Sequence, residues 1–250
     1  MIYTFYSFKG GVGRSMALAN IAELFYQVGL RVLIVDWDLE APGLERFFFE
    51  DVREIMDKPG VIDLLYDYKR RISKKLSVKK GEELPFENPY NYITDIYPNS
   101  QNGGKIYLLT AGKRSEEHYA NYADLVINFD WSDFYENWDG ELYFEWLRQQ
   151  FESIADVILI DSRTGITEMG GVCTYQFADI VVMFCAPNTQ NLEGIYEMAE
   201  SLKREEVLKV RNNRPIDLLI VPSRVEDRSM RLRLVDDLCH NRYRFTLIYP

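Results

Sequence analysis

The sequence predicts an α/β fold: a doubly wound, mostly parallel sheet flanked by helices, in a single domain with insertions. Short apolar runs recur along the chain, as expected for strands of a parallel sheet that is buried on both faces. Segments with helical periodicity lie between these runs, so strands and helices alternate. The chain has 250 residues, 47% of them hydrophobic, which is enough to bury a substantial core.

The first strand, loop and helix follow one another directly. Residues 2–8 are mostly aromatic or β-branched, which favours a strand. The glycine-rich loop, residues 9–15 (KGGVGRS), comes next. Apolar residues then recur at helical spacing from Met16 to Tyr26, and Gly29 is a typical helix stop.

Later strands are expected wherever a short apolar run follows a helical segment. These runs are 31–36, 106–109, 157–160, 180–184 and 218–221, and 245–248 is a candidate to close the sheet.

Two stretches, at about 68–104 and 116–146, are longer than a minimal version of this fold requires. We therefore expect one domain over 1–250 with two atypical insertions. The first begins with a basic segment, 69–80, which is either a solvated helix face or a site for an anionic partner. The second mixes acidic and aromatic residues and is the best candidate for a protein-binding surface. Its later part, 143–151, equally fits a core helix before the strand at 157–160.

Composition and charge exclude some classes of function for this chain. The formal net charge of -10 argues against coating of nucleic acid by the whole surface, although residues 203–244 hold 11 basic against 7 acidic residues. No apolar run approaches the length of a membrane span, and the N-terminus has no leader pattern, so a cytoplasmic location is expected. The three cysteines and two histidines lack metal-ligand or disulfide spacing.

The glycine-rich loop has the residue types that binding a phosphate chain requires. Glycines let the backbone fold around phosphate oxygens and present N–H groups at distances that a Cβ would obstruct. The helix that begins near Arg14 adds N–H groups and the positive end of its dipole. Ser15 would offer a hydroxyl to Mg²⁺, and the cation at position 14 would bridge terminal phosphates. The alternative is a flexible glycine turn.

This loop resembles that of the MinD/ParA family of P-loop ATPases, whose deviant Walker A motif has an extra lysine near its start, here Lys9. Arg14 stands where the usual P-loop lysine is found, so the resemblance is closest to a variant branch that reads Lys-Gly-Gly-Val-Gly-Arg. The resemblance implies ATP and Mg²⁺ as cofactors and slow ATP hydrolysis, at a rate that Arg14 puts in question. The expected nucleotide ligands of the loop are Lys9, Gly10, Gly11, Val12, Gly13, Arg14, Ser15 and Met16.

Two acidic motifs end strands, and ligands of open α/β sheets bind at the carboxyl ends of strands. The segment 36–44 resembles the family's switch I, in which Asp38 orients the attacking water and Asp36 lies in the magnesium shell. Alternatively, one of these aspartates caps the following turn. Asp161 ends an apolar strand, as a Walker B carboxylate does. The resemblance thus implies Lys9, Arg14 and Asp38 as catalytic residues and Ser15, Asp36 and Asp161 as metal partners.

The remaining expected ligands are less specific. Residues 162–165 resemble switch II, with Gly165 offering a backbone N–H to the γ-phosphate. Arg163 either acts as an arginine finger in cis or locks the switch by pairing with a carboxylate. Pro222 and Ser223 are expected to border adenine, as in relatives. The preference for ATP over GTP rests on the resemblance.

The sequence and its resemblance together predict a Mg·ATP-dependent dimerisation switch that acts through a protein partner. Lys9 is expected to reach the nucleotide of the facing subunit of the homodimer. One alternative is an ATP-sensing regulatory scaffold with negligible hydrolysis, as in a bacterial defence system. A second is a DNA-partitioning ATPase that uses the basic region 203–244, but nucleic acid is not the favoured partner. No membrane attachment is expected, and the sequence leaves open whether the chain is part of a longer protein.

Overall fold

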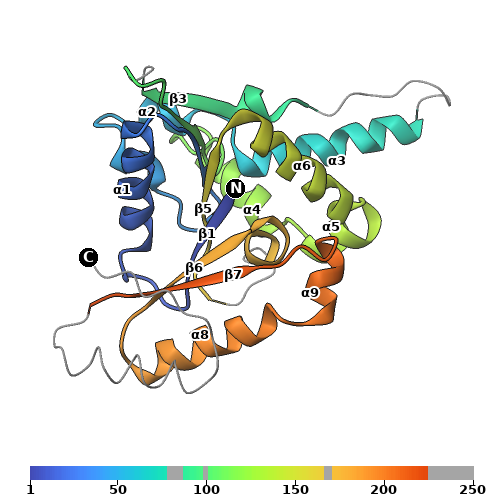
Figure 1. The fold of residues 1–250 in the computed structure, drawn as a ribbon. Coiled ribbons are helices and arrows are strands. Elements are labelled where there is room, and N and C mark those ends of the chain that lie inside the picture. The colour runs from blue at the N-terminus through green and yellow to red at the C-terminus, as the bar shows by residue number, and fades with distance from the viewer. Residues whose placement is uncertain (78–86, 98–100, 166–170, 225–250) are drawn as a thin grey trace. The chain divides into compact units, whose positions relative to one another are not determined.

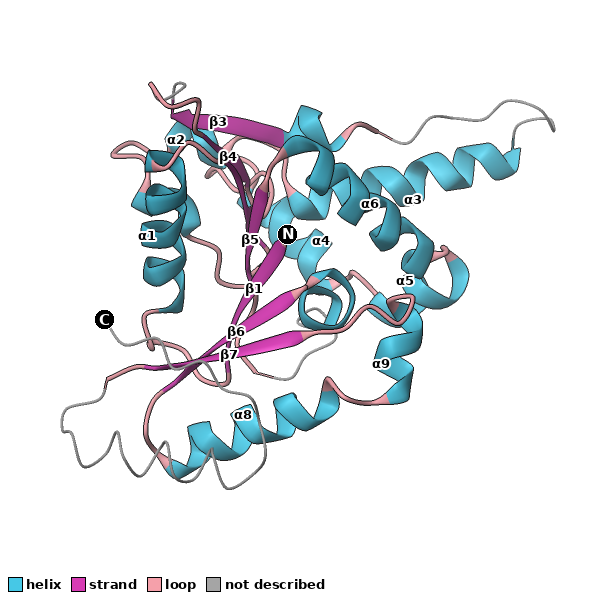
Figure 2. Ribbon diagram, in the orientation of Figure 1, coloured by secondary structure: helices cyan, strands magenta, loops and turns pink. Residues whose placement is uncertain are grey.

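The computed structural model describes residues 1–77, 87–97, 101–165 and 171–224. Their strands form one seven-stranded sheet in the order β3-β4-β2-β5-β1-β6-β7, with helices around it (Figure 2). Strand pairs β1/β6, β6/β7 and β2/β4 are parallel, and β3/β4 is antiparallel. The expected fold class is therefore confirmed.

The strands are β1 (Ile2–Ser7), β2 (Arg31–Asp36), β3 (Ile93–Tyr97), β4 (Lys105–Leu109), β5 (Val157–Asp161), β6 (Ile180–Cys185) and β7 (Asp217–Pro222). Six of them match the apolar runs of the sequence. The edge strand β3 was not expected, because it lies within the stretch 68–104 and is only half-buried. The candidate strand at 245–248 lies outside the described residues.

The helices are α1 (Arg14–Gln27), α2 (Arg53–Met56), α3 (Val61–Ser77), α4 (Tyr119–Ile127), α5 (Trp131–Asn137), α6 (Gly140–Ile154), α8 (Thr189–Ser201) and α9 (Glu205–Val210). Shorter helical turns are η1 (Leu44–Phe47), η2 (Pro89–Tyr92) and η3 (Val172–Phe177). Among the described residues, no helix combines the length and the apolar character that crossing a membrane would require.

The chain divides into two compact units, the first made of Met1–Asn20 and Leu159–Pro250 and the second of Ile21–Ile158. In the first unit, α8 packs on β6, and β6 lies between β1 and β7 (Figure 1). The buried apolar side chains of this unit come from all four elements and include Tyr6, Met183, Ile195, Met198 and Ile220. This packing fixes the carboxyl ends of the three strands, where the glycine-rich loop and residues 222–224 begin.

The second unit holds β2, β3 and β4 together with an aromatic cluster from α3, α5 and α6. Phe134 lies at its centre and contacts the rings of Tyr68, Phe129, Tyr143 and Phe144. The aromatic residues of the stretch 116–146 are thus largely core residues, and its later part forms α6 as expected.

The basic segment is less solvated than its composition indicates. In α3, the Lys69 ammonium lies 2.8 Å from the Asp133 carboxylate and over the Trp138 ring, and Arg71 pairs with Glu87. These cations therefore tie α3 to its neighbours.

Candidate functional site

The glycine-rich loop in the first unit has the backbone conformation that its glycines allow. Gly11 and Gly13 have φ angles of +73° and +83°, a region that L side chains rarely adopt. Val12 between them is buried and anchors the loop. The Gly13 carbonyl accepts the Ala17 N–H at 2.9 Å, which joins the loop to the first turn of α1.

The start of the loop packs against α8 through Phe8. The Phe8 ring lies so close to Gly194 that a Cβ at that position would be 2.2 Å from it. Lys9 is exposed, and its ammonium lies 5.3 Å from the centre of the same ring. The packing of Phe8 therefore presents Lys9 to solvent, and Met16 at the other end of the loop is exposed as well.

Three residues of the first unit meet at the buried end of the loop. The Arg14 Nε donates to Asp161 Oδ1 and the Ser15 hydroxyl donates to Asp161 Oδ2, both at 2.5 Å. The side chains of Arg14 and Asp161 are only 7% and 4% exposed. The expected phosphate cation and the expected Walker B carboxylate thus form a buried ion pair.

The residues after Asp161 are bonded to β1. The Ser162 hydroxyl donates to the Phe5 carbonyl at 2.9 Å, and the Gly165 N–H donates to the Ser7 carbonyl at 3.1 Å. Gly165 has a φ of +79°, which explains the glycine. Its N–H, expected to contact a γ-phosphate, is thus engaged with Ser7 in this structure and would have to leave it.

The end of β7 lies beside the end of β6. The Ser223 N–H donates to the Cys185 carbonyl at 2.9 Å, next to the paired residues Cys185 and Pro222. The Ser223 hydroxyl oxygen is buried, and none of the described residues forms a hydrogen bond with it. Arg224, which the sequence analysis did not assign as a ligand, reaches the glycine-rich loop: a Cβ at Gly11 would lie 3.3 Å from its Nη2.

In the second unit, the Asp36 carboxylate caps the segment that follows it. It accepts the N–H groups of Asp38 at 3.3 Å, Gly43 at 3.0 Å and Leu44 at 3.2 Å. The alternative interpretation of this motif therefore applies to Asp36, which is buried, whereas Asp38 is only half-buried. A place for Asp36 in the magnesium shell stays a prediction.

Two further contacts hold this segment. Arg114 and Glu45 form a buried bidentate ion pair with distances of 2.7 and 3.1 Å. The Tyr122 hydroxyl donates to the Leu39 carbonyl at 2.6 Å, and burial, with smaller effects from neighbouring charges, raises the pKa of Tyr122. Neither contact was expected, because the two residues of each pair lie far apart in the chain.

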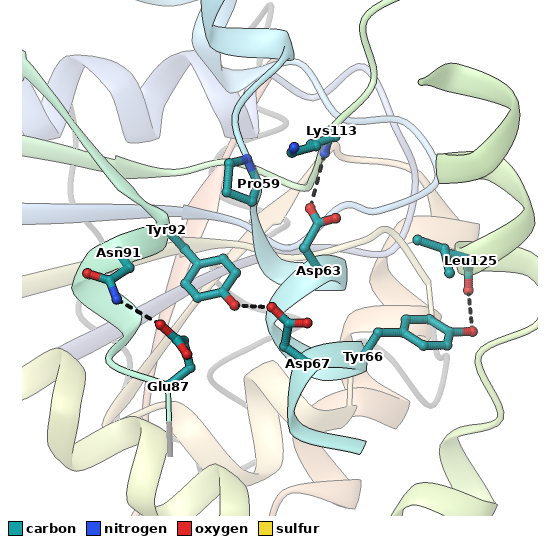
Figure 3. Close-up of a pocket in the computed structure, with 9 residues that line it drawn as sticks. All are labelled: Pro59, Asp63, Tyr66, Asp67, Glu87, Asn91, Tyr92, Lys113 and Leu125. Atoms are coloured by element: carbon teal, nitrogen blue, oxygen red, sulfur yellow. Dashed lines mark hydrogen bonds between the residues drawn. The ribbon is translucent and has the colours of Figure 1, made fainter. Parts of the chain in front are cut away.

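The second unit also contains a cavity of about 500 Å³ (Figure 3). Three carboxylates line it, and each is already bonded. Asp63 accepts the Lys113 N–H at 3.1 Å, Tyr92 donates to Asp67, and Asn91 donates to Glu87 at 2.8 Å. None of the expected nucleotide ligands lines this cavity, so it is not part of the candidate site.

The residues of the loop fit a nucleotide with Mg²⁺. The positive φ angles of Gly11 and Gly13 form a backbone cradle that side chains would not permit. The Ser15 hydroxyl and the Asp161 carboxylate are the hard oxygen donors that Mg²⁺ prefers, and Mg²⁺ commonly keeps water and phosphate oxygens as its other ligands. Accordingly, no group of three or more His, Cys, Asp or Glu side chains suited to a metal occurs among the described residues.

A family comparison agrees with this geometry. The CobQ/CobB/MinD/ParA nucleotide-binding domain matches residues 3–246. The chain belongs to this family. The match includes the glycine-rich loop, Asp36, Asp161 and the end of β7, so a single MinD/ParA-type nucleotide-binding domain spans almost the whole chain. A comparison with curated proteins gives no match.

Solved structures share the MinD/ParA-type fold. They include a plasmid partition protein from Borrelia burgdorferi, with a TM-score of 0.62 at 18% identity over 98% of this chain and 87% of that one. A McdA variant from Cyanothece in complex with ATP has a TM-score of 0.61 at 14% identity, over 98% and 81% of the two chains. Cobyrinic acid a,c-diamide synthase from Mycobacterium smegmatis, with bound ADP and magnesium, has a TM-score of 0.63 at 16% identity, over 100% and 84%. At these identities the likeness establishes the fold.

Proposed function

We propose that this protein is a Mg·ATP-dependent switch that dimerises when it binds ATP, hydrolyses it slowly and acts through a protein partner. The observation that carries the proposal is the glycine cradle with the Ser15 and Asp161 oxygens at its end. Family membership supports nucleotide binding; one solved structure of this fold is a complex with ATP, and another holds ADP and magnesium.

Each expected residue has a role that its chemistry suits. Lys9 and Arg14 neutralise phosphate charge, and the loop N–H groups bind phosphate oxygens. Ser15 and Asp161 hold Mg²⁺, which when bound neutralises charge that develops between the β- and γ-phosphates. Asp38 orients the attacking water. Asp36 caps the segment that carries Asp38 and completes the outer shell of the metal.

Binding requires the residues around Asp161 to rearrange. Arg14 and Ser15 both donate to this carboxylate, so a phosphate must take the guanidinium and a metal must take the hydroxyl. The Gly165 N–H must likewise leave Ser7 to reach a γ-phosphate. A partner protein would recognise the nucleotide-bound state by these local changes in conformation.

Calorimetry with ATP tests the binding step. Wild-type protein should bind ATP more tightly with Mg²⁺ than with EDTA, because Ser15 and Asp161 bind through the metal. Ser15→Ala should remove most of this difference, whereas Ser153→Ala, which changes a hydroxyl on α6, should keep it. Absence of heat with wild-type protein, ATP and Mg²⁺ would contradict the proposal.

Sedimentation tests the dimer. Lys9→Ala should abolish the ATP-dependent dimer while weak nucleotide binding persists, because Lys9 is exposed at the start of the loop. The exposed Lys58→Ala is the matched control and should dimerise like wild type. An unchanged dimer in Lys9→Ala would refute the role of this lysine.

The buried pair of Arg14 and Asp161 favours a second candidate, an ATP-sensing scaffold with negligible turnover. An arginine held in this pair must be released before it can stabilise the negative charge that develops on the oxygen between the β- and γ-phosphates. Phosphate release by wild type and Arg14→Lys separates the candidates. Turnover that occurs only in the lysine variant supports the scaffold, and turnover in wild type supports the switch.

A further inference from the structure

The Arg224 guanidinium reaches the glycine-rich loop at Gly11. It comes from the end of β7, and its Nη2 is 3.3 Å from the place where a Cβ of Gly11 would be. Gly11 is the residue whose φ of +73° turns the loop, so any larger side chain there would meet this guanidinium. The contact joins two segments of the first unit that are more than 200 residues apart in the chain.

The backbone positions Arg224 for this contact. Ser223 continues the pairing of β7 with β6 through its N–H bond to Cys185, so the chain is fixed up to that residue. Arg224 itself has a φ of +54°, an uncommon conformation for a residue other than glycine. Such conformations persist where the surrounding structure holds them and are found at ligand sites.

The two arginines at the loop differ in their electrostatic surroundings. Arg14 is buried and is neutralised by Asp161. Arg224 is exposed, and none of the described carboxylates forms an ion pair with it. The loop therefore carries a guanidinium whose charge is not compensated by the described part of the chain. Its planar set of N–H donors matches the oxygens of a phosphate group.

We propose that Arg224 binds the phosphate chain of the nucleotide, a phosphate contact that supplements Arg14. The inference rests on the proposed function, because it needs a nucleotide in the loop. A group that touches Gly11 touches the part of the backbone that cradles phosphates, which favours a phosphate over the base as its ligand. Arg224 thus contributes a charge that Arg14, while paired with Asp161, does not.

Three ligands separate this role from base recognition: ADP, pyrophosphate and adenosine, each measured by calorimetry. Arg224→Ala should weaken binding of ADP and of pyrophosphate about tenfold or more, the value of one charge-assisted hydrogen bond. Binding of adenosine should stay unchanged. Arg224→Lys should recover part of the loss, since the charge remains.

Arg204→Ala is the matched control, because Arg204 is an exposed arginine directly before α9, an element that precedes β7 in the chain. It should bind all three ligands like wild type. Equal losses for adenosine and ADP in Arg224→Ala would overturn the inference in favour of a base contact, and unchanged ADP and pyrophosphate binding would overturn it outright. Failure of wild-type protein to bind ADP or pyrophosphate would instead overturn the proposed function itself.

Discussion

Asp161 organises the buried end of the glycine-rich loop. Its two oxygens accept from Arg14 and Ser15, the residues expected to bind phosphate and metal. The carboxylate thereby neutralises the buried guanidinium of Arg14. Removing one partner of a buried pair is costly, because it leaves the other charge desolvated and unpaired.

Asp161→Asn should therefore lower the free energy of unfolding by about 3 kcal/mol in the absence of nucleotide. Asp156→Asn is the control, since Asp156 pairs with Arg31 at 2.7 Å but both side chains are more than 40% exposed. An exposed pair of this kind is worth less than about 1 kcal/mol. Urea denaturation of both variants measures the difference. Equal losses of unfolding free energy in the two variants would show that Asp161 does not neutralise Arg14 in the nucleotide-free protein.

At the scale of elements, the segment 36–44 depends on contacts with distant parts of the second unit. Asp36 caps it from within, Glu45 is held by Arg114, and the Leu39 carbonyl accepts the Tyr122 hydroxyl. Arg114 lies between β4 and α4, and Tyr122 lies in α4, so the order of this segment depends on the part of the chain that follows β4. A segment anchored in this way can be loosened without unfolding the unit.

Tyr122→Phe should loosen this segment selectively. The change removes only a buried hydroxyl, so the cost is about 1 kcal/mol and the ring still packs. Hydrogen exchange of residues 38–44 should become faster, while exchange in β2 stays slow. Tyr66→Phe is the control, because that hydroxyl donates at 3.1 Å to the Leu125 carbonyl in α4. Faster exchange in 38–44 for the control as well would point to general destabilisation.

Whether a feature of the fold or of the candidate site could be predicted depends on how far apart in the sequence its interacting residues lie. The loop and the buried strands were predictable, because glycine spacing and apolar runs are local signals. The strand β3 was not, since its residues are half-buried at a sheet edge and their pattern is weak. The pairing of Arg14 with Asp161 and the reach of Arg224 to Gly11 join residues far apart in sequence, and no local pattern encodes them.

At the scale of the whole molecule, net charge governs how two copies meet. The chain carries a formal charge of -10, so two copies repel each other at long range. Salt screens this repulsion, with a Debye length of about 10 Å at 0.1 M. Binding of nucleic acid by the basic region 203–244 would respond in the opposite way, because salt weakens contacts between cations and phosphates.

The rate of ATP-dependent dimer formation should therefore rise several-fold between about 20 and 200 mM salt, as long-range repulsion is screened. Stopped-flow mixing of donor- and acceptor-labelled protein in Mg·ATP measures this rate by energy transfer, and mixing without nucleotide gives the background. The same salt series with a DNA duplex should show weaker binding as salt increases, if any binding occurs. A dimerisation rate that falls with salt would mean that local attraction, such as that of Lys9 for the facing nucleotide, outweighs the net charge during the encounter.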